Sequence, residues 1–319
     1  MGELVRVSGR PKPRVCVAFS GGLDSSVLLD VLALEAAAEL IAVSAIHVHH
    51  GLSANADAWS RHCAATCDRL RIPLEIVRVR VQHRARQSIE EEARKARYAA
   101  LRDVRADVVA LAHHADDQAE TILLQLLRGA GPKGLAAMAA VGTADANGAA
   151  PIYWRPFISI DRAQLAAYAA DAGLAWVEDE SNRDCDLRRN YLRQHVMPRI
   201  AGAFPASGRL LARAARLQAE AASLLDVLAD MDIETLSLEA GLDCPRLALL
   251  ARDRQANLLR RWLTRAGARA PSSARLAALQ KAIGDSSNDT RLAWMHEGFS
   301  VVRRKAVLLL EIRPPPLQG

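Results

Sequence analysis

The chain has 319 residues, of which 50 % are apolar and 24 % are charged, and its formal net charge is +6. This is the composition of a globular protein that is too long for one small core. No apolar run approaches the roughly 18 residues of a membrane span, so we expect no membrane partner. The modest basic excess suits a polyanionic partner but equally suits an ordinary soluble surface.

The five cysteines form no even-numbered disulfide framework, which excludes a small secreted scaffold. Cys63 and Cys67 have C-x3-C spacing on a helix-like stretch, whereas zinc knuckles and redox pairs space their cysteines two apart. We interpret both as half-buried helix residues. The first 14 residues lack the apolar core of a signal peptide, so we expect a reduced, cytoplasmic protein.

The first 160 residues alternate short β-branched runs with longer amphipathic segments. Strands are predicted at residues 14–19, 41–48, 74–81, 106–112 and, more weakly, 151–155. Helices are predicted at residues 24–40, 56–70, 88–102 and 116–127. This alternation is typical of a doubly wound α/β fold, a parallel sheet with helices on both faces. Ligands of such sheets bind at the carboxyl ends of the strands.

The second half of the chain has a different pattern. Glycine-rich residues 128–134 and 141–150 are predicted to be mobile surface loops. Beyond Pro198, helices at residues 210–232 and 247–267 are rich in arginine, and residues 290–312 resemble short strands with a turn at Glu297 and Gly298. We therefore divide the chain into a larger domain, residues 1–205, and a smaller helical and α+β domain, residues 206–319.

The most informative segment is SGGLDSS, which lies between the first predicted strand and helix. Its glycines permit a tight turn, and the helix-start amides with the serine hydroxyls form a cradle for an anion. The seven residues of this cradle are Ser20, Gly21, Gly22, Leu23, Asp24, Ser25 and Ser26. A carboxylate repels phosphate, but a magnesium ion between Asp24 and the phosphates would remove that conflict. The alternative is a plain turn capped by Asp24.

The SGGLDS sequence in this strand–loop–helix context is neither a Walker loop nor a dinucleotide fingerprint. It resembles the pyrophosphate loop (PP-loop) of the N-type ATP pyrophosphatases. Those enzymes split ATP between the α and β phosphates and transfer AMP to an acceptor. The resemblance implies a PP-loop catalytic domain at residues 1–205.

Further motifs narrow the resemblance. They are HHGLSANAD at residues 49–57, EEARKARY at 91–98, HHADDQAET at 113–121, SNRD at 181–184 and RNYLR at 189–193. Together with SGGLDS they resemble the tRNA(Ile)-lysidine synthases across most of residues 14–200. The region beyond resembles that family's tRNA-contacting domain more loosely.

The HHADDQAET segment places two carboxylates near the end of the fourth strand. Asp117 and Glu120 follow His113 by four and seven residues, which aligns all three on one helix face. Two carboxylates at a ligand-binding edge suit a cationic substrate such as lysine. The alternative is an acidic helix start that the helix dipole stabilises, and the family resemblance favours lysine.

Arginines supply candidate partners for phosphate. The resemblance implies that Arg97 neutralises the ATP α-phosphate and that Arg189 lies near the reaction site. Arg94, one turn before Arg97, fits a solvated basic face equally well. Several histidines lie near both loops, but no zinc-binding pattern accompanies them, so we do not expect zinc.

The resemblance implies a ligase that uses ATP and Mg²⁺, with the metal at Asp24. Its substrates would be free L-lysine and the wobble cytidine of an isoleucine tRNA with a CAU anticodon, the product being lysidine. The implied catalytic residues are Asp24, His113, Arg97 and Arg189. The implied tRNA contacts are Arg128, Lys133, Arg193, Arg260 and Arg261. A homodimer remains possible.

Two other functions remain open. A tRNA cytidine thiolase of the same superfamily would need paired C-x-x-C cysteines, which the sequence lacks. A nucleotide-binding module without catalysis would keep the phosphate loop, but it would not explain Asp117, Glu120 and Arg189 beside a basic domain.

Overall fold

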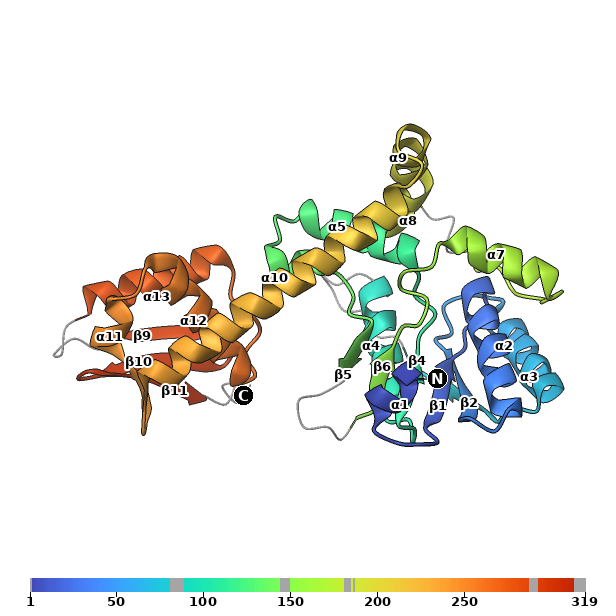
Figure 1. Cartoon of the computed structure of the whole chain (residues 1–319), viewed down its shortest axis with the longest axis horizontal. Coiled ribbons are helices and arrows are strands. Elements are labelled where there is room, and N and C mark those ends of the chain that lie inside the picture. Colours follow the sequence, from blue (N-terminus) through green and yellow to red (C-terminus); the bar gives the residue numbers. More distant parts are fainter. Residues whose placement is uncertain are drawn as a thin grey trace. The chain divides into compact units, whose positions relative to one another are not determined.

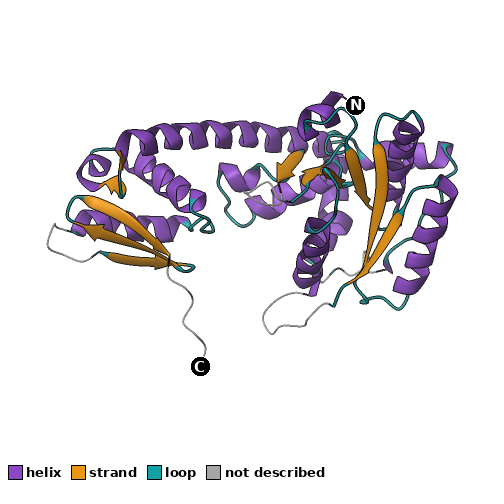
Figure 2. Ribbon diagram, turned by 90° about the horizontal axis from the view of Figure 1, so that it is seen from below, coloured by secondary structure: helices purple, strands orange, loops and turns teal. Residues whose placement is uncertain are grey.

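The computed structural model describes residues 2–80, 89–143, 150–180, 185, 187–286 and 292–312. The chain forms two compact units, Met1–Ala219 and Glu220–Gly319, each with its own sheet and helices (Figures 1 and 2). The boundary between the units falls inside helix α10 (Ser207–Leu236), whereas the predicted division after residue 205 precedes that helix. The SNRD segment lies outside the described residues.

A six-stranded sheet with the order β3-β2-β1-β4-β6-β5 forms the centre of the first unit. Its strands are β1 (Arg14–Ala18), β2 (Ala42–His49), β3 (Leu74–Arg78), β4 (Val108–Ala110), β5 (Val141–Thr143) and β6 (Ile152–Trp154). All neighbouring strands are parallel except β5, which is antiparallel to β6. The predicted parallel α/β sheet is confirmed, and each predicted strand overlaps an observed one.

Both glycine-rich segments contain regular structure that the sequence analysis missed. Residues 141–143 form the edge strand β5, in which Val141 pairs with Trp154 and Thr143 with Ile152. Helix α6 (Pro132–Leu135) follows Gly131, because proline is well tolerated in the first turn of a helix. The prediction of loops is therefore wrong for residues 132–134 and 141–143, whereas residues 144–149 lie outside the described residues.

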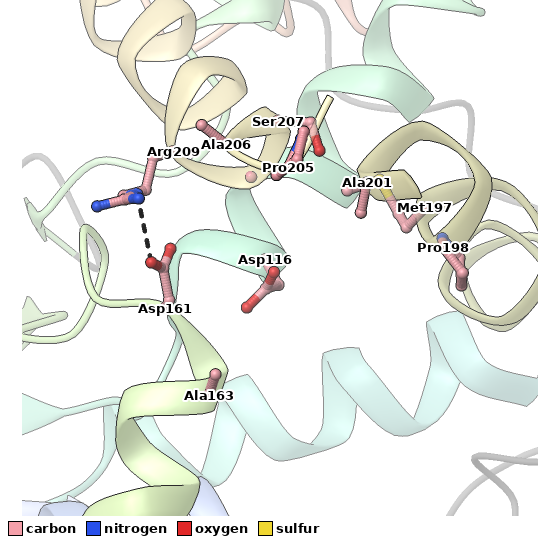
Figure 3. Close-up of a pocket in the computed structure, with 11 residues that line it drawn as sticks. Asp116, Asp161, Ala163, Met197, Pro198, Ala201, Pro205, Ala206, Ser207 and Arg209 are labelled. Atoms are coloured by element: carbon pink, nitrogen blue, oxygen red, sulfur yellow. Dashed lines mark ion pairs between the residues drawn. The ribbon is translucent and has the colours of Figure 1, made fainter. Parts of the chain in front are cut away.

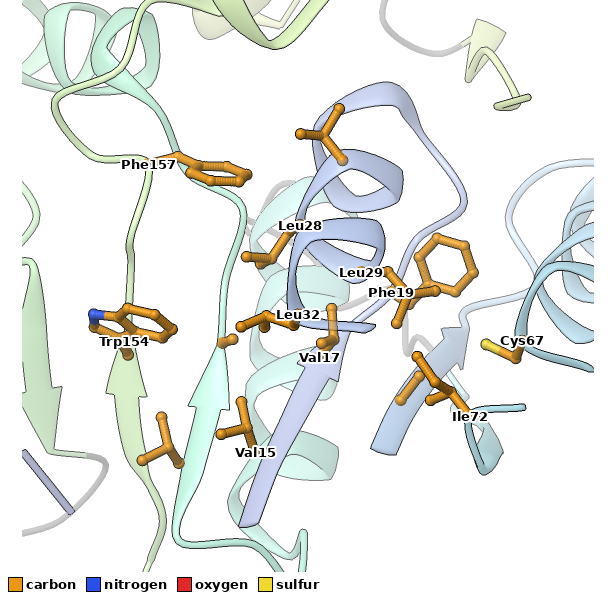
Figure 4. Packing of buried hydrophobic residues seen from close by; sticks show 14 of the residues in the cluster. Val15, Val17, Phe19, Leu28, Leu29, Leu32, Cys67, Ile72, Trp154 and Phe157 are labelled. Atoms are coloured by element: carbon orange, nitrogen blue, oxygen red, sulfur yellow. The ribbon is translucent and has the colours of Figure 1, made fainter. Parts of the chain in front are cut away.

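Helices cover both faces of the sheet. On one face, α2 (Leu23–Ala37), α3 (Ala56–Leu70) and α7 (Arg162–Asp171) pack on a core that includes Val17 and Leu29 (Figure 4). On the other face lies α4 (Ile89–Arg102), whose Leu101 belongs to a second cluster with Val109 and Tyr153. Right-handed crossovers explain this division: the chain steps from β1 to β2 to β3, and α4 then returns it to β4 on the far side of β1.

The order of the strands fixes where a ligand binds. The chain moves in one direction from β1 to β2 and in the other direction to β4, so the sheet has its switch point between β1 and β4. Open α/β sheets bind ligands at this point, outside the carboxyl ends of the strands. The loop after β1 contains SGGLDS, and the loop after β4 leads into α5 (Ala115–Leu126).

The remaining helical segments of the first unit are short. They are α1 (Gly2–Ser8), α8 (Arg188–Tyr191), a π-helical turn at Leu192–Val196, and α9 (Met197–Ala203). The longer α7 was not predicted, although Asp161 and Gln164 give it a capping signal: the Asp161 amide donates to Gln164 Oε1 at 3.2 Å.

Cys63 and Cys67 are 0 % and 1 % exposed, so the prediction that they are half-buried is wrong. Both lie on the face of α3 that packs on the sheet. Burial is the main cause that raises the pKa of the Cys63 thiol to about 12 and that of Cys67 to about 11. All five cysteines are free thiols.

The second unit contains an antiparallel sheet in the order β7-β8-β11-β10-β9. Its strands are β7 (Ser237–Leu238), β8 (Gly241–Asp243), β9 (Ala293–His296), β10 (Phe299–Arg304) and β11 (Val307–Ile312). The predicted turn at Glu297 and Gly298 joins β9 to β10, with φ of 44° and 83°. No helix in the described part of the chain is long and apolar enough to cross a membrane.

Helices α11 (Cys244–Ala248), α12 (Arg252–Arg265) and α13 (Ser273–Asp285) complete the second unit. The predicted helix at residues 247–267 is thus two helices, interrupted between Leu249 and Ala251. Helix α13 was missed, although Ser272 caps it by accepting a hydrogen bond from the Arg275 amide at 3.3 Å.

An ion pair joins the starts of β1 and β4, and it gives a pH-dependent prediction. Asp107 accepts hydrogen bonds from the Arg14 amide at 2.8 Å and from Arg14 Nη2 at 3.0 Å. The hydrogen bond from the Arg14 side chain is the main cause that lowers the pKa of Asp107 below its ordinary 3.8. A lowered pKa stabilises the fold above the unfolded value, and this contribution disappears as the pH falls through the folded value.

We therefore expect Asp107→Asn to lower the free energy of unfolding by on the order of 1 kcal/mol at pH 7. The difference from the wild type should shrink below pH 4, and urea unfolding at pH 7 and pH 3.5 measures it. An equal difference at both pH values would contradict this assignment.

Candidate active site

The SGGLDS loop is shaped by hydrogen bonds within the chain. Ser25 Oγ donates to the Gly22 carbonyl at 3.0 Å and lies 3.0 Å from Ser20 Oγ. The Val177 amide donates to the Gly21 carbonyl at 2.9 Å. Within the turn, Ser20 is exposed, Gly21 is buried and Gly22 is half-buried.

The start of α2 offers donors to an anion. The first amides of a helix have no acceptor within the helix. Those of Leu23, Asp24 and Ser25 also have no hydrogen-bond partner elsewhere among the described residues. These three N–H groups, at the positive end of the helix dipole, are the donors that the predicted anion cradle would use.

Gly21 is required for two reasons. Its φ is +85°, and a Cβ at this position would lie 3.0 Å from Cys63 Sγ and 3.1 Å from Val177 Cγ2. We expect Gly21→Ala to destabilise the fold by about 1–3 kcal/mol and to weaken ATP binding. Gly173→Ala is the matched control, because Gly173 has φ +61° but no atom within 4 Å of a Cβ. Thermal unfolding of both variants separates crowding from backbone strain, and equal shifts would contradict the role of crowding.

His114, which was predicted only as part of the HHADDQAET segment, connects the two loops. Its side chain is 2 % exposed and surrounded by three carboxylates. Its Nε2 lies 3.6 Å from Asp24 Oδ2 and 3.4 Å from Asp117 Oδ2, and its Nδ1 lies 3.5 Å from Asp116 Oδ2. Burial alone would lower the pKa of His114, but these carboxylates outweigh burial and raise it to about 9. The imidazolium therefore holds the loops after β1 and β4 together.

His113 differs from its neighbour in charge. Burial is the main cause that lowers its pKa to about 3, and the nearby Arg155, Arg97 and Arg189 contribute to the shift. The ring is therefore neutral near pH 7. Its Nδ1 is buried and has no hydrogen-bond partner in the described part of the chain. It can accept a proton from a substrate, although only weakly.

Asp117, Glu120, Arg189 and Arg193 form a compact group of charges, which we call the quartet. Arg189 donates through Nε to Glu120 at 2.7 Å and through Nη2 to Asp117 at 2.8 Å. Arg193 donates through Nε to Glu120 at 2.6 Å and through Nη2 to Asp117 at 3.1 Å. Two guanidiniums thus balance two carboxylates, and the quartet is neutral.

The quartet brings together several of the residues predicted from the sequence. Asp117 and Glu120 share one face of α5, as their spacing predicts. Arg189, predicted near the reaction site, contacts both carboxylates. Arg193, which was predicted to contact tRNA, also pairs with both carboxylates. The i, i+4 spacing of the two arginines, across α8 and the π-helical turn, places both on the side that faces α5.

The other predicted residues lie apart from the quartet. Arg97 is exposed on α4 with its guanidinium 5.7 Å from the Tyr98 ring centroid. Arg128 and Lys133 are exposed near α6. In the second unit, Arg261 donates to Asp230 at 2.7 Å and to Asp226 at 3.1 Å, so carboxylates of the same unit already balance its charge.

A pocket of about 340 Å³ lies beside α5 within the first unit (Figure 3). Asp116 and Asp161 contribute carboxylates to its wall, and Arg209 pairs with Asp161 at 3.4 Å. Its apolar wall includes Met197 and Ala201. Asp116 also faces His114, so the pocket adjoins the carboxylates around that imidazolium.

A largely parallel sheet with the SGGLDS turn at its switch point is the arrangement of a PP-loop domain. Family comparison agrees: residues 2–200 match the PP-loop domain family, and residues 242–308 match the TilS substrate binding domain. The chain belongs to the tRNA(Ile)-lysidine synthase family.

Curated relatives named tRNA(Ile)-lysidine synthase match along most of the chain. The protein of Chromobacterium violaceum is 51 % identical over 80 % of this chain and 58 % of its own length. That of Methylococcus capsulatus is 45 % identical over 92 % and 67 %, and that of Xanthomonas axonopodis is 40 % identical over 94 % and 68 %. The chain thus spans about three fifths to two thirds of the length of these relatives.

Among solved structures, the U34-tRNA thiolase NcsA from Methanococcus maripaludis, determined with its [4Fe-4S] cluster, is similar in fold. Its TM-score is 0.56 over 68 % of this chain and 77 % of that one, at 18 % sequence identity. This similarity supports the PP-loop fold assigned above.

Proposed function

We propose that this chain forms lysidine on the wobble cytidine of an isoleucine tRNA with a CAU anticodon, using ATP and free L-lysine. The observation that carries the proposal is the juxtaposition of two loops at the switch point. One offers free helix-start amides and the other supplies buried carboxylates, in a chain of the lysidine synthase family.

The triphosphate of ATP would lie on residues 20–26, with its oxygens on the amides of Leu23, Asp24 and Ser25. Asp24 Oδ1 is a buried carboxylate oxygen without a hydrogen-bond partner among the described residues, and Arg162 Nε lies 3.7 Å from it, so this position already attracts a cationic group. The described part of the chain contains no group of three or more His, Cys, Asp or Glu side chains that could together hold a metal ion. Mg²⁺ needs no such group, because it is commonly held by one carboxylate, phosphates and water. When bound, it would neutralise charge on the phosphates.

The proposed reaction has two displacements. The O2 oxygen of the cytosine attacks the α-phosphorus of ATP, and pyrophosphate leaves. The ε-amine of lysine then attacks C2 of the base, and the C2–O2 bond breaks as AMP leaves with that oxygen. Adenylation thus converts a poor leaving group into a good one. Arg97 would neutralise charge on the α-phosphate, and the neutral His113, a weak base, would accept a hydrogen bond from the attacking amine.

The lysine would be held by its α-ammonium group at Asp117 and Glu120, which leaves the ε-amine free to react. Their carboxylates are buried and already bind two guanidiniums, so the site is built for cationic nitrogen. Thiolation is not favoured. Cys63 and Cys67 are buried with raised pKa values, and thiolate chemistry requires the opposite.

Positive charge on both units would hold the tRNA phosphates. Arg128 and Lys133 are exposed beside α6, and Arg260 forms no ion pair among the described residues. Contacts of this kind fix the position of the nucleic acid without reading its sequence. Free cysteine thiols are compatible with the reducing cytoplasm, where we expect the protein to act.

The test is incubation of the purified chain with ATP, Mg²⁺, radiolabelled L-lysine and total tRNA. We expect label to enter tRNA with the release of one pyrophosphate for each lysine. Omission of ATP, and replacement of total tRNA by tRNA lacking the CAU-anticodon species, serve as controls. Incorporation of sulfur rather than lysine, or no release of pyrophosphate, would contradict the proposed function.

A further inference from the structure

The quartet exposes its guanidiniums and buries its carboxylates. The side chains of Asp117 and Glu120 are 11 % and 2 % exposed, whereas those of Arg189 and Arg193 are 23 % and 37 % exposed. Each arginine uses Nε and Nη2 on the carboxylates. The Nη1 group of each donates to no acceptor in the part of the chain that the structure describes. Arg193 therefore presents unused N–H donors, and it does so more openly than Arg189.

A ligand at these carboxylates brings a second charge with it. If Asp117 and Glu120 hold the α-ammonium of lysine, as the proposed function requires, the α-carboxylate is attached to the same carbon atom. It must lie beside two buried carboxylates, which repel it unless a cation is adjacent. Arg193 contacts those same carboxylates, and its planar fork suits a carboxylate ligand.

We propose that Arg193 binds the α-carboxylate of the free amino acid and so selects amino acids over amines that lack this group. The inference rests on the proposed function. The charge balance supports it: the quartet is neutral, and an amino-acid head group adds one positive and one negative charge. A polyamine would add only positive charge beside two guanidiniums. Arg189, which is more buried, stays on the carboxylates and keeps them compensated.

The test compares L-lysine with cadaverine, which is lysine without its carboxylate, as the amine that enters tRNA. For the wild type we expect kcat/KM to be about 10- to 100-fold lower with cadaverine. Arg193→Met should lower kcat/KM for lysine by a similar factor, mainly through KM, and should change kcat/KM for cadaverine much less. The discrimination between the two amines should then nearly vanish, and Arg193→Lys should restore part of it.

Arg188→Met is the matched control, because Arg188 is an exposed arginine of α8, the helix that directly precedes the π-helical turn with Arg193. It should change neither amine's kinetics. Equal losses for both amines in Arg193→Met would show a merely structural role, and a rise in the KM for tRNA alone would show a tRNA contact. Either outcome overturns the inference.

Two further outcomes separate the inference from the proposed function. Equal use of lysine and cadaverine by the wild type would overturn the inference while the proposed function stands, and this comparison needs no variant to fold. If the wild type incorporated no lysine, both the inference about Arg193 and the proposed function would be contradicted.

Discussion

Asp24→Asn is expected to lower tRNA-dependent pyrophosphate release about 100- to 1,000-fold while the fold remains intact. Asparagine is nearly the same size, but its neutral amide neither attracts Mg²⁺ nor balances the His114 imidazolium 3.6 Å away. The loss of stability should be small. The side chain of Asp24 is 29 % exposed, and its interaction with the helix dipole contributes less than about 1 kcal/mol.

Glu35→Gln is the control for this variant, since it removes one negative charge from the same helix, α2, away from the loop. Pyrophosphate release at saturating ATP and lysine, together with thermal unfolding, gives the comparison. If the folded Asp24→Asn protein released pyrophosphate at the wild-type rate, Asp24 would have no role in the reaction.

Glu120→Gln is expected to affect both stability and lysine use. The side chain is 2 % exposed and accepts short hydrogen bonds from Arg189 and Arg193, so the amide leaves two guanidiniums with too little negative charge. Breaking a buried ion pair from one side is costly. Because both guanidiniums are partly exposed, we expect a loss of about 2–3 kcal/mol, which is below the usual range of about 3–5 kcal/mol.

The same substitution should raise the lysine requirement, because it removes half of the pair proposed to hold the α-ammonium. Glu91→Gln is the control: its carboxylate is 60 % exposed and lies 3.7 Å from Lys95, and such pairs contribute at most about 1 kcal/mol. Chemical unfolding gives the stabilities, and KM for lysine is measured where both variants are folded. An unchanged KM for lysine would show that Glu120 does not bind the amino acid.

Local pattern was sufficient for much of the fold. Runs of β-branched residues predict the strands β1, β2 and β4. Apolar residues at helical spacing predict the helices between them, and both patterns extend over only a few residues. Alternating strands and helices then imply a parallel sheet, and handedness leaves few topologies. Patterns failed where the segments were short: β5 has only three residues, and α13 has little signal beyond its Ser272 cap.

What the sequence by itself determined was local geometry: a glycine turn before α2 with helix-start amides, and two carboxylates on one face of α5. Both result from spacing along a single element. The tertiary structure alone decided that His114 joins Asp24, and that Arg189 and Arg193 reach carboxylates some 70 residues earlier in the chain. Contacts of this kind depend on how separate elements pack, because packing brings distant side chains together and sets their burial and charge.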